Sequence, residues 1–169
     1  MSSHATERPY GVALEPDVER AIAALNLEYA RAIDEDQLEL WPDFFIERCV
    51  YKVQSRRDYE LGRPACLMLC DSRGMLLDRV NAIRRVNVFE PHRYRHIVGP
   101  TKILDAQVGC IQTYTSYLVI RTSQNGAMDL FSAGSYRDEV MFEGGAPKFS
   151  KRSVVCDSDA IDTLLSLPL

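Results

Sequence analysis

Residues 108–142 read VGCIQTYTSYLVIRTSQNGAMDLFSAGSYRDEVMF, and their pattern indicates the class of fold. From Val108 to Ser123 the side chains alternate, and β-branched, aromatic and hydroxyl residues are frequent, which is typical of a half-buried antiparallel strand. Gln124-Asn125-Gly126-Ala127 predicts a hairpin, because Asn-Gly tolerates positive φ at both turn positions. Met128–Phe142 is then the return strand.

Further β-structure is expected on both sides of this hairpin. Glu143-Gly144-Gly145 predicts a second turn, and Lys148–Cys156 a third long strand. The expected upstream elements are a strand at Cys49–Ser55, a helical turn at Arg57–Leu61, a strand at Ala65–Cys70 and a two-residue period from Arg93 onward.

The first third of the chain has helical periodicity instead. Val18, Ile22, Leu25, Tyr29 and Ile33 recur every three or four residues and predict one apolar stripe on a helix from Pro16 to Asp34. A second helix is predicted over Ser72–Arg84 from Leu76, Val80 and Ile83. Between them, Asp36 and Glu39 are expected to cap a short helix that Pro42 interrupts. The residues expected to be buried are Val18, Ile22, Leu25, Tyr29, Trp41, Phe44 and Phe45.

Helices followed by a long antiparallel meander predict an α+β fold with the helices on one face of a curved sheet. There are no repeats or low-complexity linkers, so residues 16–169 are expected to form a single domain. Residues 1–15 are expected to be an N-terminal extension.

Charge and hydropathy exclude several classes of partner. The 169 residues carry a formal charge of −4 and a pI near 5.4, whereas nucleic acids and anionic membranes attract an excess of Lys and Arg. No apolar run approaches the roughly 18 residues that span a bilayer. Met1–Glu15 lacks the blocks of a signal peptide, so the cytoplasm is the expected location.

The cysteines and histidines do not form a recognisable metal site. The five cysteines are expected to be reduced, buried thiols, because cytoplasmic chains rarely keep structural disulfides: Cys49, Cys66, Cys70, Cys110 and Cys156. Their spacing fits neither zinc nor a Rieske cluster. Glu90, His92 and His96 have the residue types of an iron triad, but on a strand the two histidines lie about 13 Å apart. No catalytic, cofactor-binding or metal-binding residue is therefore assigned to this chain.

Arginines are concentrated between residues 73 and 95 of a net-acidic chain. Two interpretations remain open: internal salt bridges to Asp71, Asp78 and Glu90, or a subunit interface, where the planar guanidinium is favoured. The interface candidates are Arg73, Arg79, Arg93, Tyr94, Arg95 and His96. For His96, two roles are considered: an acid–base pair with either Asp71 or Asp105, or a polar anchor between the sheet and a loop.

Three segments carry a family resemblance: Met75-Leu76-Leu77-Asp78-Arg79, Tyr94-Arg95-His96-Ile97-Val98-Gly99, and the ending from Val155 to Leu169. In this order they resemble the small (β) subunits of aromatic-ring-hydroxylating dioxygenases, the Rieske non-haem iron oxygenases. The ending is similar to the terephthalate type in particular, and salicylate-hydroxylase small subunits are close.

The resemblance implies a cone-shaped fold like that of nuclear transport factor 2. It also implies a large (α) subunit that carries the Rieske [2Fe–2S] cluster and mononuclear Fe(II). The expected assembly is an α3β3 hexamer that receives electrons from NADH through a reductase.

Three functions are therefore considered. The first is a non-catalytic β subunit of an oxygenase that hydroxylates a terephthalate- or salicylate-like acid in aromatic catabolism. The second is a stand-alone isomerase or dehydratase of the same cone fold that uses His96 and a carboxylate. The third is a homodimeric binding module without chemistry.

Overall fold

The computed structural model describes residues 14–85, 91–159 and 165–169. In chain order its elements are α1 (Pro16–Asp34), the 3-10 helix η1 (Leu38–Phe44), β1 (Phe45–Ser55), α2 (Arg56–Glu60), β2 (Met68–Cys70), α3 (Arg73–Arg85), β3 (His92–Gln107), β4 (Cys110–Ser123), β5 (Met128–Glu143) and β6 (Ala146–Cys156). Most of the predicted N-terminal extension and residue Glu90 lie outside the described residues.

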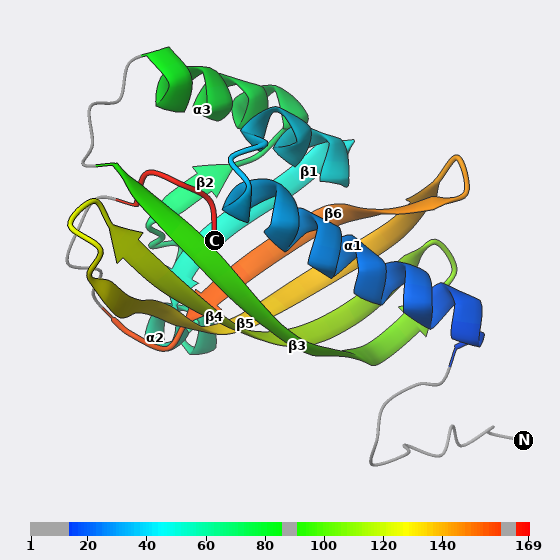
Figure 1. Cartoon of the computed structure of the whole chain (residues 1–169). Helices are drawn as coiled ribbons and strands as arrows, with labels where there is room; N and C mark the ends of the chain where they lie inside the picture. Colours follow the sequence, from blue (N-terminus) through cyan, green and yellow to red (C-terminus); the bar gives the residue numbers. More distant parts are fainter. Residues whose placement is uncertain (1–13, 86–90, 160–164) are drawn as a thin grey trace, which may run out of the picture.

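The strands form one six-stranded sheet in the order β2-β1-β6-β5-β4-β3. Figure 1 shows α1 running across this curved sheet, with α3 beside β1 and β2. The predicted α+β class with helices packed on a sheet is confirmed. The meander β3–β4–β5–β6 is antiparallel throughout, and the two predicted turns join β4 to β5 and β5 to β6.

The expected antiparallel sheet has one exception, because β1 and β6 pair in parallel. Val50 lies beside Lys151, and Ser55 beside Cys156. A parallel pair needs a long crossover, and here everything from α2 to β5 provides it. The sequence pattern could not reveal this pairing, because a side-chain period of two is the same for parallel and antiparallel neighbours.

Helix α1 has the predicted bounds and the predicted apolar stripe. Pro16 lies in its first turn with Asp17 and Glu19, where the helix dipole favours acidic groups. Five of the seven residues expected to be buried are buried: Ile22, Leu25, Tyr29, Trp41 and Phe45. Val18 and Phe44 are only partly buried and pack against the margin of the core.

The region after α1 differs from the prediction. Gln37, not Asp36, is the N-cap of η1, and Asp36 has a φ of 57°. The carboxylates of Asp36 and Glu39 turn to Arg84 instead of capping a helix. Pro42 does not interrupt η1, since the short helix continues through it and the ring itself is buried. The flanking strands also shift, as β1 starts at Phe45 and β2 shrinks to Met68–Cys70.

The predicted hairpin between β4 and β5 is present, with a different turn from the expected one. Gly126 has a φ of 84°, while Asn125 is not in the left-handed region. Asn125 instead accepts a hydrogen bond from the Ala127 amide through its side-chain oxygen, at 2.9 Å. An asparagine side chain that bonds the backbone two residues ahead stabilises such turns without positive φ.

Candidate functional site

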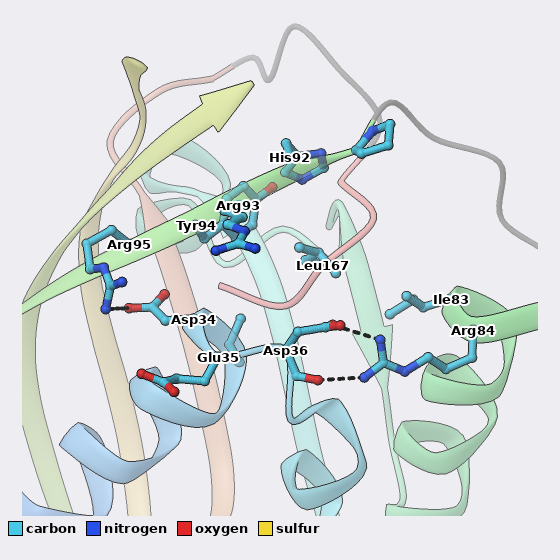
Figure 2. Close-up of a pocket in the computed structure, with 12 residues that line it drawn as sticks. Asp34, Glu35, Asp36, Ile83, Arg84, His92, Arg93, Tyr94, Arg95 and Leu167 are labelled. Carbon is cyan, nitrogen blue, oxygen red and sulfur yellow. Dashed lines mark hydrogen bonds and ion pairs between the residues drawn. The ribbon is translucent and has the colours of Figure 1, made fainter. Parts of the chain in front are cut away.

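A cavity of about 780 Å³ opens where the ends of α1 and α3 face the start of β3 (Figure 2). Its lining residues are Ile33, Asp34, Glu35, Asp36, Ile83, Arg84, Pro91, His92, Arg93, Tyr94, Arg95 and Leu167. We refer to it as the mouth cavity. Its walls combine three consecutive carboxylates with three arginines, over an apolar base of isoleucine and leucine.

Asp34, the last residue of α1, binds β3 directly. Its carboxylate accepts hydrogen bonds from the His96 backbone amide, at 2.9 and 3.1 Å, and lies 2.6 Å from His96 Nδ1. Both side chains are almost fully buried, with exposed fractions of 4% for Asp34 and 0% for His96. The contact fixes the imidazole and leaves His96 Nε2 buried without a hydrogen-bond partner among the described residues.

The acid–base pair that the sequence left possible, His96 with Asp71 or Asp105, does not form. The partner is Asp34, and the Asp105 carboxylate binds the local Ala106 amide and Gln107 side chain. His96 and Asp34 are 62 residues apart in sequence. Their meeting depends on how α1 crosses the sheet, which no local spacing encodes.

The arginines of the mouth cavity differ in their partners. Arg84 is held by Asp36 at 2.7 Å and by Glu39 at 2.7 and 3.0 Å. Hydrogen bonding to Arg84 lowers the pKa of Glu39. Arg95 lies 3.8 Å from Asp34, and its side chain is 66% exposed. Arg93 is exposed, and its side chain has no hydrogen-bond or ion-pair partner among the described residues. Figure 2 shows it turned towards the cavity.

The six interface candidates thus separate into groups. Arg93, Tyr94 and Arg95 line the mouth cavity, and His96 lies behind it. Tyr94 is buried and stacks on Phe131 at 5.0 Å, and burial raises its pKa.

Arg73 and Arg79 lie on α3 and are not among the residues that line the mouth cavity. Arg73 pairs with Asp43 and bonds the Pro42 carbonyl, while Arg79 donates to the carbonyls of Leu165 and Ser166.

The expected salt bridges of this arginine-rich segment had the wrong partners. Within the described part of the chain, the acidic partners are Asp43, Asp36, Glu39 and Asp34 rather than Asp71 and Asp78. The predicted partner Glu90 lies outside the described residues.

The acidic wall Asp34-Glu35-Asp36 was missed by sequence reasoning, although it carries a signal. Three carboxylates at the C-terminal end of a helix face the negative end of the helix dipole, which is unfavourable. Such a run indicates that cations from elsewhere in the fold compensate it, as Arg84 and Arg95 do here.

Deeper in the cone, a buried ion pair crosses strands β5 and β6. Arg152 and Asp138 have side chains that are 0% exposed, joined by bonds of 3.1 and 2.7 Å. Arg152 also bonds the side-chain oxygen of Asn26 on α1. Its guanidinium lies 4.2, 4.1 and 3.9 Å from the ring centroids of Tyr29, Tyr136 and Phe149.

The described part of the chain holds no cluster of metal ligands. Across residues 14–85, 91–159 and 165–169, no group of three or more His, Cys, Asp or Glu side chains could hold a metal ion. All five cysteines are free. Cys49, Cys70 and Cys156 are buried as expected, whereas Cys66 is exposed and Cys110 half-buried. No described helix is long and apolar enough to cross a membrane.

Comparisons with known proteins identify the family. The ring hydroxylating beta subunit family model matches residues 28–163. Subunit beta 1 of the terminal oxygenase component of terephthalate 1,2-dioxygenase from Comamonas is 38% identical over 148 residues, 88% of this chain and 96% of the relative. The anthranilate 1,2-dioxygenase small subunit from Burkholderia cepacia is 33% identical, again over 148 residues, 88% of this chain and 92% of the relative.

A solved structure agrees with these relatives. A beta subunit assigned to an aromatic-ring-hydroxylating dioxygenase of Novosphingobium aromaticivorans has a TM-score of 0.83 and 35% identity, covering 90% of this chain and 97% of that chain. The predicted cone-shaped fold like that of nuclear transport factor 2 is thereby confirmed. The chain belongs to the ring hydroxylating beta subunit family and is the small subunit of an aromatic-ring-hydroxylating dioxygenase.

Proposed function

We propose that this chain is a non-catalytic, structural β subunit that assembles with a large α subunit as an α3β3 hexamer in the cytoplasm. The Rieske [2Fe–2S] cluster and the mononuclear Fe(II) belong to the α subunit in this proposal, and a reductase delivers electrons from NADH. The complex hydroxylates an aromatic carboxylate. That substrate class is supported by two relatives whose names state acids of this kind, terephthalate and anthranilate.

The observation that best supports a non-catalytic role is the inaccessibility of the cone interior. The His96 side chain has no exposed surface. The space beside Tyr29 of α1 and Tyr51 of β1 is occupied by residues 165–169, and Leu169 is 0% exposed. A general acid or base must come within hydrogen-bond reach of its substrate, and a fully covered imidazole offers a substrate no atom to reach.

The mouth cavity is the surface that we assign to the α subunit. Arg93 and Arg95 offer exposed guanidinium groups there, and arginine is enriched at protein interfaces because it combines apolar area with several donors. Arg73 and Arg79 are already bonded within the chain, so we expect them to stabilise the β subunit more than the interface. We expect Arg93 to donate hydrogen bonds to a carboxylate or backbone carbonyl of the α subunit.

The stand-alone isomerase or dehydratase remains the second candidate because of one contact. Asp34 and His96 form a pair at 2.6 Å whose outer nitrogen, Nε2, has no hydrogen-bond partner among the described residues. A carboxylate that orients a histidine in this way is a common acid–base arrangement.

Co-expression with the large subunit from the same genome tests the assignment. Arg93→Ala should weaken the complex by roughly 1–3 kcal/mol if the residue is a desolvated hot spot, that is about 5- to 150-fold in Kd. The matched control is Arg57→Ala, an exposed arginine on α2. Pull-down yield and analytical ultracentrifugation measure assembly, and thermal unfolding of the isolated variant measures its fold.

Two results would contradict the proposal. If Arg93→Ala and Arg95→Ala both leave the Kd of the complex unchanged, the α subunit docks elsewhere. If His96→Asn abolishes oxygenase turnover while assembly and iron content stay normal, the chain contributes to catalysis and is not a structural subunit alone.

A further inference from the structure

Residues 165–169 lie inside the fold instead of on its surface. Ser166 is 1% exposed, Leu167 8% and Leu169 0%. In Figure 1 these residues, drawn in red, lie between β3 and β1. A five-residue segment buried to this degree indicates a complementary pocket beneath it.

Two tyrosine hydroxyls in that pocket donate their hydrogen bonds to the backbone of Leu169. Tyr29 and Tyr51 donate to the Leu169 carbonyl oxygen, at 2.8 and 3.2 Å. The Leu169 amide donates back to the Tyr51 hydroxyl at 2.9 Å, and Trp41 Nε1 donates to the Tyr29 hydroxyl at 3.3 Å. Both tyrosines are 0% exposed, and burial raises the pKa of each, so they remain protonated donors.

This geometry means that the pocket is incomplete without its occupant. A buried hydroxyl without a partner is unfavourable, and buried polar groups are nearly always hydrogen-bonded. Without Leu169, the Tyr51 hydroxyl would lose both bonds to that residue, and the Tyr29 hydroxyl would lose its acceptor and keep the bond from Trp41. Aromatic side chains with two inward hydroxyls form a site for an aliphatic side chain that adjoins a backbone carbonyl and amide.

A second contact holds the other end of the segment. Arg79 on α3 donates to the Leu165 and Ser166 carbonyls, at 2.6 and 3.1 Å. Leu167, between the two anchors, contributes to the wall of the mouth cavity. The segment therefore connects α3, the mouth and the centre of the cone.

We propose that Tyr29, Trp41 and Tyr51 form a binding pocket for a leucine-type peptide segment, which residues 165–169 occupy as a tethered ligand. The pocket recognises the branched aliphatic side chain through its rings and the backbone carbonyl and amide through the two hydroxyls. A chain without the segment accepts the same peptide added in trans. Because every group involved belongs to this chain, the partner subunit is not needed for binding.

The experiment removes residues 165–169 and adds the acetylated peptide Leu-Ser-Leu-Pro-Leu to the truncated chain. We expect a lower melting temperature for the truncated chain, saturable 1:1 binding of the peptide by calorimetry, and recovery of the melting temperature. The control peptide has Asp in place of the final Leu and should neither bind nor restore stability. A folded truncated chain that ignores the leucine peptide, or that binds both peptides equally, would overturn the proposal.

The full-length chain supplies a test that does not depend on whether the truncated chain folds. Tyr51→Phe keeps the ring but removes both hydrogen bonds to Leu169, so the Leu169 amide should exchange with solvent faster by on the order of tenfold. Tyr59→Phe, at an exposed tyrosine on α2, should leave this exchange unchanged. If the Leu169 amide of the unmodified chain exchanges as fast as an unstructured amide, the segment does not occupy the pocket and the proposal fails.

Discussion

Replacing Asp138 with asparagine should destabilise this protein strongly, because it leaves the charge of Arg152 unbalanced in the core. Burial lowers the pKa of Arg152, but the negative charge of the Asp138 carboxylate and its hydrogen bonds raise that pKa by more. A guanidinium group is not deprotonated in proteins, so Arg152 stays charged after the substitution even though that support is lost. The new asparagine side chain would keep one acceptor oxygen for a hydrogen bond but would carry no charge.

The size of the effect follows from the surroundings of Arg152. Removing one partner of a buried ion pair typically costs about 3–5 kcal/mol. The ring centroids of Tyr29, Tyr136 and Phe149 lie 3.9–4.2 Å from the guanidinium. Their cation–π interactions with the unpaired charge can offset up to about 2 kcal/mol of that loss. We therefore expect a loss of about 3 kcal/mol, which corresponds to roughly 6–12 °C in the melting temperature of a domain of this size.

Urea unfolding measures this loss. Trp41 is the only tryptophan and is 0% exposed, so its fluorescence reports the transition of the core. Glu139→Gln is the matched control, since this carboxylate lies on the same strand but pairs with Lys151 at the surface, and its loss should change stability by less than about 1 kcal/mol.

The double replacement of Asp138 and Arg152 by leucine should be milder than Asp138→Asn, because it leaves no buried charge. If Asp138→Asn costs no more than Glu139→Gln, the reasoning about the buried charge is refuted.

Other substitutions and measurements test separate features of the structure. Gly134→Ala should destabilise by about 2–3 kcal/mol, because the added Cβ would lie 2.0 Å from the Val155 carbonyl oxygen and force β5 from β6. Gly99→Ala, where the nearest atom is at 3.4 Å, should be tolerated; similar unfolding midpoints for the two would contradict this. At pH 8 a thiol reagent should modify exposed Cys66 quickly, whereas buried Cys49, whose pKa burial raises to about 11, should react only after unfolding. The purified chain should contain no stoichiometric iron or zinc, and one equivalent that survives chelator washing would disprove this.

Local sequence pattern was sufficient to predict most of the helices and strands of this protein. The apolar stripes of α1 and α3 and the alternation in β4, β5 and β6 predicted the elements and the α+β class. These patterns record which side of each element faces water, and that information is contained in neighbouring residues. The positions of two turns were predicted from Asn125-Gly126 and Gly144-Gly145, because turn preferences are also a property of neighbouring residues. The order of three short motifs identified the family.

The candidate site depended on contacts between distant segments. Asp34 meets His96 across 62 positions, and Tyr29 meets Leu169 across 140. Acidic residues near the arginines in sequence proved to be the wrong partners, because Arg84 and Arg95 are paired with the end of α1 and the residues that follow it.

The parallel pairing of β1 with β6 has the same origin. Residue periodicity specifies a buried face but not the element that covers it. Which groups meet is decided when the helices and the tail close over the curved sheet and each buried polar atom must find a partner.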